Sequence, residues 1–293
     1  MRSLQSKRDT LFVWVGEKAS HLIYRLKRSL LTILGLAIMV GFISVAILAP
    51  LIAPYDPISI NPSERLMPPS KAHFFGTDTA GRDIFSRIVY GSRISLRLGI
   101  IVTGLSVVIG SLIGGAAAFL GGRIDDAVMR FTDLCMAFPV FILAMVITAS
   151  LGPGLTNVMV AIVAIWWTVY ARLVRSKVVE VREETYIEAA RAIGTSGMRI
   201  FFKHVLPNSY SPVLVEATLD FGFVVMMGAS LGFVGLGAQP PSPEWGAMIS
   251  TGRSYLKTAW WYPTFPGFAI FLVVLGANLL GDGLRDLLEV RTR

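Results

Sequence analysis

Charged residues are scarce in this chain of 293 residues: Asp, Glu, Lys and Arg make up 16% of it, whereas 54% is hydrophobic and the mean hydropathy is +0.63. A soluble domain carries roughly 25% charged residues. The shortage excludes an ordinary soluble enzyme and indicates a polytopic membrane protein. The net charge of +8 does not point to nucleic acid, because the basic residues cluster beside apolar runs, as they do in cytoplasmic loops of membrane proteins.

Cysteine and histidine are equally rare. The single cysteine, Cys135, excludes a disulfide within the chain, and the three histidines (His21, His73 and His204) lack metal-ligand spacing. The sequence contains no G-x-x-x-x-G-K-[ST] loop, the backbone cradle for the phosphates of ATP. A plausible nucleophile-and-base set is also missing. We therefore expect no catalytic residues, no metal and no cofactor on this chain.

Long apolar runs predict an all-α fold with six membrane-spanning helices, each able to cross about 30 Å of hydrocarbon. They are expected at about 30–50, 97–120, 132–151, 157–173, 212–236 and 264–281. Phe138-Pro139 should kink the third span. Pro50 directly follows the first run and should block signal-peptide cleavage, so that span is expected to be retained.

The spans divide the chain into five segments. In order, these are a basic tail (1–29), the first span (30–50), a Pro-rich loop with an amphipathic interfacial helix (51–96), a five-helix core (97–285) and a short tail (286–293). Most of the 27 Lys and Arg fall in the tails and in loops on the same side, which predicts cytoplasmic N- and C-termini. The loop 51–96 is then external.

Small residues recur every four positions in the second predicted span, at Ser106, Gly110, Gly114 and Ala118. In lipid, such a face lets two helix backbones approach closely. We expect a helix–helix contact here; a wall of the substrate path is the less favoured alternative.

The longest polar interruption of the apolar core lies at 185–207 and predicts a helix–turn–helix. Thr185 and Glu188 have the spacing of a capping box, so a helix should begin at Thr185. Gly194 should end it, because glycine tolerates the left-handed conformation at a helix C-terminus. A second helix, about 197–204, should end before Leu206-Pro207.

Within this interruption, the residues Glu188, Ala189, Ala190, Gly194, Leu206 and Pro207 resemble the EAA loop of binding-protein-dependent ABC importer permeases. The resemblance implies a cytoplasmic coupling helix that docks on an ATPase. His204 departs from the general pattern, where a branched aliphatic residue is usual. Two simpler interpretations stay open: Glu188 only caps its own helix, and the two alanines are only good helix formers.

Two further stretches resemble the permeases of peptide and nickel importers. The first contains Gly76, Thr77, Asp78, Gly81, Arg82 and Asp83, and the second contains Pro240, Pro241, Glu244, Trp245 and Gly246. Trp245, and the group Trp260, Trp261 and Tyr262, are expected at the outer membrane interface. The external arginines Arg82, Arg87 and Arg93 run against the positive-inside bias. Lipid or acidic partners within the chain are favoured for them over an anionic substrate.

Two acidic residues, Glu216 and Asp220, lie one helical turn apart in the fifth predicted span. Acids in a membrane are costly and deserve a functional interpretation. Because they lie near the cytoplasmic end, pairing with Arg172 or Arg175 is favoured over proton coupling.

The resemblance as a whole implies the type I ABC importer permease fold and a subunit of the bacterial inner membrane. It further implies a heterodimer of two permeases, two cytoplasmic ATPases that bind ATP and Mg, and an external solute-binding protein. Dipeptides or oligopeptides are the expected cargo, with glutathione and nickel chelates left open. The alternative is a stand-alone secondary transporter or channel driven by an ion gradient through Glu216 and Asp220.

Overall fold

Helices dominate the computed structural model, which describes residues 30–289, and across that range the only β pairing is an isolated bridge between Thr77 and Asp83. Within this described range, five helices are long and apolar enough to cross a membrane: α2 (Leu30–Ile47), α4 (Ile84–Leu120), α7 (Leu155–Arg182), α11 (Ser211–Phe233) and α13 (Trp261–Glu289). A sixth crossing exists if α5 (Gly122–Met136) and α6 (Val140–Leu151) count as one span. The predicted tail 1–29 and the last four residues of the tail 286–293 lie outside the described range.

The third predicted span is sharply broken rather than kinked. α5 and α6 meet at an angle of 88° around Pro139, which begins α6 as its N-terminal flanking residue. Proline lacks a backbone N–H, so it cannot continue the hydrogen-bond ladder of α5. α5 also begins at Gly122, ten residues before the predicted start of the span.

The predicted division between an interfacial helix and a second span at residue 97 is wrong. Residues 84–120 form one helix, α4, whose 37 residues extend about 55 Å at 1.5 Å per residue. That exceeds the roughly 30 Å hydrocarbon layer, so α4 projects beyond it. Asp83 caps its first turn, and Gly121 ends it with a positive φ of 71°.

Close helix contacts rely on small residues. A side chain at Gly114 would lie 2.1 Å from the backbone oxygen of Ala171, and one at Gly110 would lie 2.4 Å from that of Trp167, so the backbones of α4 and α7 nearly touch. Ser106 and Ala118 are buried on the same helix. The four small residues thus lie at a helix–helix contact, where packing provides the attraction that the hydrophobic effect cannot supply in lipid.

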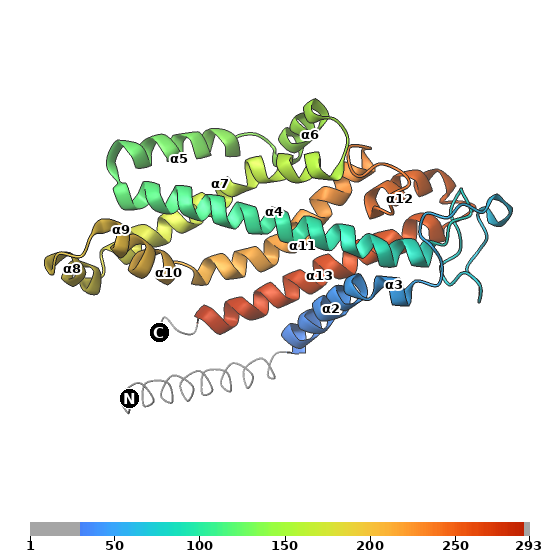
Figure 1. The fold of residues 1–293 in the computed structure, drawn as a ribbon, viewed down its shortest axis with the longest axis horizontal. Coiled ribbons are helices and arrows are strands. Elements are labelled where there is room, and N and C mark those ends of the chain that lie inside the picture. Colours follow the sequence, from blue (N-terminus) through green and yellow to red (C-terminus); the bar gives the residue numbers. More distant parts are fainter. Residues whose placement is uncertain (1–29, 290–293) are drawn as a thin grey trace.

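α13 lies between α2 and α11 (Figure 1). Gly276 packs against Ile38 on one side, and Gly222 of α11 packs against Ala277 on the other. Large apolar side chains remain exposed on the spans, for example Ile43, Ile142 and Phe271. These faces are suited to lipid or to another membrane-embedded chain.

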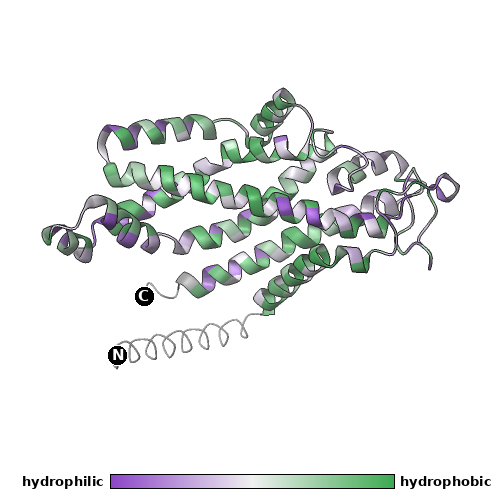
Figure 2. Cartoon of the chain, viewed as in Figure 1, coloured by the Kyte–Doolittle hydropathy of each residue, from purple (hydrophilic) through white to green (hydrophobic). Residues whose placement is uncertain are grey.

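The two ends of the bundle differ. One end carries α8 (Thr185–Ala192), α9 (Gly197–Ile200), η2 (Phe201–Val205) and α10 (Leu206–Asn208). The opposite end, here the α12 end, carries α3 (Ala49–Ile52), η1 (Pro62–Glu64), α12 (Trp245–Gly252) and η3 (Arg253–Tyr255) (Figure 1). Hydrophilic residues concentrate toward these ends, whereas the helices between them are largely apolar (Figure 2).

Candidate functional site at the two ends of the bundle

The turn between α8 and α9 is built on Gly194, as predicted. Its φ of +80° lies in the left-handed region, where a side chain would be strained. The backbone N–H of Gly194 donates to the oxygen of Arg191 at 2.9 Å, and that of Thr195 donates to the oxygen of Ala190 at 3.1 Å. This pair of bonds is the Schellman motif, which satisfies the last carbonyls of a helix.

The predicted capping box of Thr185 and Glu188 is absent. Glu184 occupies the N-cap position in extended conformation, and its backbone oxygen accepts from the N–H of Ile187 at 2.9 Å. The helix begins at Thr185, as predicted, but the N-cap position falls on Glu184, one residue earlier than a capping box of Thr185 and Glu188 requires. The Glu188 side chain is exposed and makes no hydrogen bond to any described residue, which removes the cap-only interpretation.

Pro207 does not end the second helix at residue 204. A π-helical turn, Phe201–Val205, precedes Leu206–Asn208, and the helical path continues through the proline. A proline inside an α-helix clashes with the carbonyl four residues earlier. The wider π turn absorbs that clash, a device common at irregular functional segments.

The α8–α10 segment is anchored on the bundle by an apolar inner face. Ile187, Ile200 and Val205 are buried, and the ring of Phe201 lies 5.4 Å from that of Phe119 on α4. Arg182 adds a polar tie by donating from Nη1 to the backbone oxygen of Ala118 at 2.9 Å.

The outer face of the same segment carries large apolar side chains that nothing in the described chain covers. Their exposed fractions are 83% for Ile193, 71% for Met198, 52% for Phe202 and 43% for Tyr186. No role was predicted from the sequence for Ile193 or Tyr186. Met198 and Phe202 are four residues apart and therefore lie on one face of the helix, whereas Ile200 points inward. This helical spacing is the sequence feature that could have identified the outer apolar face. Glu188 and Ala189 are exposed too.

The predicted pairing of Asp220 with Arg172 or Arg175 is wrong. Oδ2 of Asp220 accepts from Nε1 of Trp166 at 2.7 Å and from the hydroxyl of Tyr170 at 2.6 Å, both on α7. Asp220 is 6% exposed, so this neutral pair of donors holds a buried carboxylate in the bundle. Neutral donors on an adjacent helix can satisfy an acid without bringing a cation into the membrane.

The two arginines pair elsewhere. Arg175 makes a bidentate contact with Asp125, at 2.7 Å from both Nε and Nη2, and Arg172 pairs with Asp133. Both acids lie on α5, and therefore the arginines fasten α5 to α7 rather than neutralising α11. The sequence could not show this because it did not predict that α5 is helical from residue 122.

At the α12 end, the arginines that opposed the positive-inside bias are bound internally. Asp78 is fully buried; its Oδ2 accepts from Nε of Arg82 at 2.7 Å and lies 3.6 Å from Nε of Arg87. Its Oδ1 accepts from the backbone N–H groups of Ala80 and Arg82 at 2.8 Å and 3.0 Å. Gly81 has φ +74°, and a side chain there would meet the backbone oxygen of Asn61 at 1.7 Å, so only glycine fits this turn.

The neighbouring loop is ordered by Asp83, the N-cap of α4. Its Oδ2 accepts from the backbone N–H of Ser86 at 2.7 Å, and its Oδ1 lies 2.9 Å from Nδ1 of the buried His73. Nε2 of His73 lies 3.4 Å from a carboxylate oxygen of Glu64. Thr77 donates its hydroxyl to the backbone oxygen of Glu64, and Gly76 leaves room for the ring of Trp261.

The two stretches that resemble peptide and nickel permeases contact each other. Nη1 of Arg87 donates to the backbone oxygens of Pro57 at 2.7 Å and Pro241 at 3.3 Å, and Nη2 donates to that of Ser242 at 3.4 Å. Trp245 donates from Nε1 to the backbone oxygen of Ile88 at 3.1 Å. Through these contacts, the two stretches and the Pro-rich loop form a single layer that closes the α12 end of the bundle.

Trp245, expected at the outer membrane interface, is buried inside the protein and is 2% exposed. The ring fits over Gly91, where a side chain would meet Nε1 at 2.4 Å, and its N–H has a partner inside the protein. Of the expected aromatic belt, Trp260 is 52% exposed, whereas Trp261 and Tyr262 are buried.

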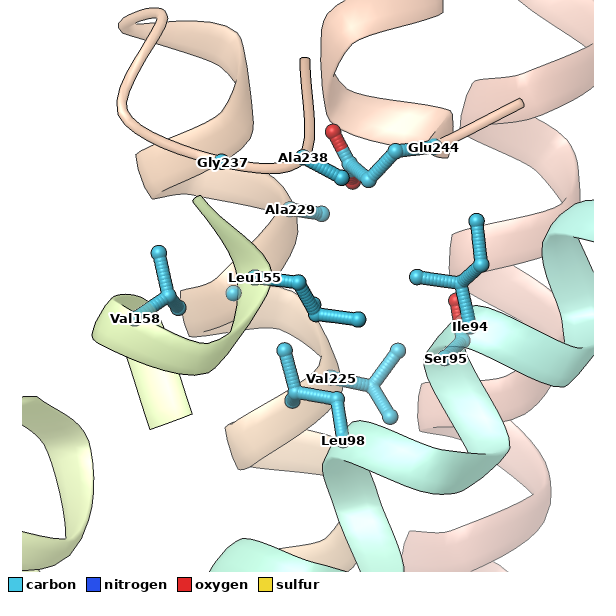
Figure 3. Close-up of a pocket in the computed structure, with 11 residues that line it drawn as sticks. Ile94, Ser95, Leu98, Leu155, Val158, Val225, Ala229, Gly237, Ala238 and Glu244 are labelled. Carbon is cyan, nitrogen blue, oxygen red and sulfur yellow. The ribbon is translucent and has the colours of Figure 1, made fainter. Parts of the chain in front are cut away.

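Glu244 is the N-cap of α12 and faces a small cavity (Figure 3). Its oxygens accept from the backbone N–H groups of Gly246 and Ala247 at 2.8 Å and 2.7 Å. Burial raises the pKa of Glu244 to about 7, although the two backbone hydrogen bonds oppose the rise. The cavity measures about 10 Å³ and is lined mainly by apolar side chains such as Ile94, Leu155 and Val225, so it holds at most one water. It is not a peptide-sized site.

The sequence matches the models of two known protein families. The family described as "Binding-protein-dependent transport system inner membrane component" matches residues 101–293, about two thirds of the chain. The chain belongs to this family. A second family, the "N-terminal TM domain of oligopeptide transport permease C", matches residues 21–69.

Several curated relatives of this permease cover nearly its whole length. It is 48% identical over 269 residues to the "Dipeptide transport system permease protein DppC" of Alkalihalophilus pseudofirmus, covering 92% of this chain and 88% of the relative. It is 46% identical over 268 residues to the "Probable D,D-dipeptide transport system permease protein DdpC" of Escherichia coli, covering 92% and 90%. The fold is similar to an inward-facing MetNI methionine ABC transporter, with a TM-score of 0.56, 22% identity, and coverage of 72% of this chain and 98% of that chain.

Family membership and this fold establish the type I permease architecture and a multi-pass inner-membrane protein. The permease is a component of a binding-protein-dependent transport system. A stand-alone ion-coupled transporter or channel is not favoured by these matches, and the internal hydrogen bonds of Asp220 remove its main support.

Proposed function

We propose that this permease forms half of a pathway that carries dipeptides or oligopeptides inward across the inner membrane. The relatives named for dipeptide and D,D-dipeptide transport cover about nine tenths of the chain and support this cargo class. A second permease of the same family supplies the other half. The heterodimer assembles with two ATPases, which bind ATP and Mg, while this chain binds neither.

The observation that carries the coupling proposal is the uncovered apolar face of the α8–α10 segment. Tyr186, Ile193, Met198 and Phe202 are all exposed, at 43% to 83%, on the segment that forms this end of the bundle. On a cytoplasmic segment such a patch favours a protein partner, since isolated apolar patches of this kind mark interaction sites. We assign it to the ATPase.

The six residues of the EAA resemblance divide into two roles in this proposal. Glu188 and Ala189 face outward and would contact the ATPase directly. Ala190 and Leu206 are packed against the bundle core, Gly194 shapes the turn, and Pro207 follows the π-helical turn. These four fix the angle of the contact surface.

The topology follows from this assignment. The α8–α10 end and both termini lie in the cytoplasm, and the α12 end faces the solute-binding protein. ATP-driven closure of the ATPases would draw the α8–α10 segments of the two permeases together. Because α7 leads directly into α8 and packs closely along α4, the movement reaches the spans and shifts the population toward the state open to the binding protein.

The coupling surface can be tested by Met198→Asp and Ile193→Asp, compared with Arg123→Gln, an exposed change at the same end outside the patch. We expect the two Asp variants to insert normally but to lose co-purification of an ATPase from gently solubilised membranes, and to lose peptide uptake. Retention of the ATPase at the level of the control variant would disprove the assignment of this surface.

A further inference from the structure

An open groove between α2 and α4 is not explained by the transport function. It has a volume of about 500 Å³ and is lined by Arg93, Arg97, Ile47, Ile100 and neighbouring apolar residues. Ile47 is 63% exposed and Ile100 is 58% exposed, so the apolar wall is open to the membrane side of the bundle. The side chains of two arginines, Arg93 and Arg97, therefore border a hydrophobic groove beside the membrane-spanning helix α4.

Of the two arginines that line the groove, Arg97 is the more unusual. It is exposed, and it makes no hydrogen bond or ion pair with any residue in the described range 30–289. It lies on α4, one of the helices that are long and apolar enough to span the membrane. An unpaired cation in such a segment is costly and should find an anion or reach the interface.

Arg93 lies one helical turn closer to the α12 end and is only partly satisfied. Its Nε donates to the backbone oxygen of Ala46 at 2.7 Å, and its Nη2 donates to that of Ile47 at 3.2 Å, because α2 ends there and leaves its last carbonyls free. Nη1 has no hydrogen-bond partner in the part of the chain that the structure describes. These bonds hold the Arg93 guanidinium at the mouth of the groove.

Two other arginines of this end are not available in the same way. Arg82 and Arg87 are bound to Asp78, and Arg87 also binds three backbone oxygens. The contrast singles out Arg93 and Arg97 as a pair of cations, one turn apart, with donors left over.

We propose that this groove binds one anionic phospholipid from the leaflet on the α12 side. The phosphate would accept from Arg97 and from the free nitrogen of Arg93, since a guanidinium fork matches phosphate oxygens. An acyl chain would lie along Ile47 and Ile100. A free phosphate ion uses only the cationic half of the groove, and therefore the apolar wall commits the site to a lipid. Basic pockets between transmembrane helices hold lipid head groups in this way.

The test uses the assembled transporter, purified in mild detergent, with lipids retained after detergent exchange measured by mass spectrometry. Three variants are compared: Arg97→Gln removes the charge, Ile100→Trp fills the groove, and Arg65→Gln is the control, an exposed arginine at the same end outside the groove. We expect a several-fold loss of retained phosphatidylglycerol for the first two variants and no loss for the control. Wild-type retention by Arg97→Gln would overturn the proposal.

A second measurement separates lipid from other anions and from fold defects. In nanodiscs of phosphatidylcholine alone, wild type and Arg97→Gln should unfold at the same temperature. Adding phosphatidylglycerol should raise the midpoint of the wild type only. The proposal fails if inorganic phosphate in phosphatidylcholine nanodiscs gives the same rise, or if a photo-reactive residue at Ile100 cross-links to a polypeptide instead of a lipid.

Discussion

At the scale of single residues, the permease satisfies buried polar groups with unexpected partners. Asp220 is held by Trp166 and Tyr170 rather than by an arginine. Glu244 is held by two backbone N–H groups, and no cation among residues 30–289 pairs with it. Each arrangement keeps a carboxylate inside the protein without a second charge, and each predicts a distinct response to substitution.

Asp220→Asn should keep peptide uptake near the wild-type level, because the amide oxygen can still accept from Trp166 and Tyr170. Asp220→Ala should lower the unfolding temperature in detergent, because two buried donors lose their acceptor, at a cost of about 1–3 kcal/mol. Uptake assays and thermal unfolding on both variants check this pair. Abolished uptake in a stably folded Asp220→Asn would instead revive proton coupling.

Glu244 should make stability depend on pH. Burial raises its pKa in the folded protein to about 7, above its ordinary value of 4.5, so folding favours the protonated form. The contribution of Glu244 to the free energy of unfolding is therefore fully present below about 4.5, falls as pH rises, and is lost above about 7. We expect the thermal midpoint of the wild type to fall over this range relative to Glu244→Gln, which cannot ionise. Parallel pH profiles of the two proteins would contradict the assignment.

At the scale of elements, the contact between α4 and α7 depends on the absence of side chains. Gly114→Val should strongly destabilise the protein, because its Cβ would lie 2.1 Å from the backbone oxygen of Ala171 and the helices must separate. Gly104→Val is the matched control, since nothing lies within 4 Å of a Cβ there on the same helix. Thermal unfolding and yield of inserted protein should drop for the first variant and stay near wild type for the second.

Elements also show how far sequence reasoning reaches. The apolar runs, the glycine turn at Gly194 and the small-residue face of α4 were predictable, because each follows from local composition or a fixed spacing. The continuity of α4 was not predictable, because residues 84–96 are amphipathic and their pattern is equally typical of a separate interfacial helix. The partners of Asp220 and the burial of Trp245 depend on contacts between distant segments, which a single sequence does not specify.

At the scale of the whole molecule, one arginine joins segments far apart in the chain. Arg87 connects the Pro-rich segment through Pro57 with the stretch before α12 through Pro241 and Ser242. Arg87→Gln should loosen both, because a neutral amide cannot reach all three oxygens or attract Asp78. Limited proteolysis from the α12 side should then cut within residues 54–83 at a several-fold higher rate. An unchanged cleavage rate would show that the other contacts of this layer suffice.

The contacts that close the α12 end also determine when this end can assemble during protein synthesis. Within residues 30–289, Arg87 belongs to the second helix that can span the membrane, but two of its acceptors lie 154 and 155 residues later. Phe75 likewise stacks on Phe265 and Gly76 receives Trp261, both from the last helix. A ribosome that has completed α11 has produced α4, α7 and the contact between them, but neither α13 nor the residues that close the α12 end. Assembly of the α12 end therefore waits until α13 has been synthesised, and a chain interrupted before Pro241 would present Arg87 without these two acceptors to the cell's quality control.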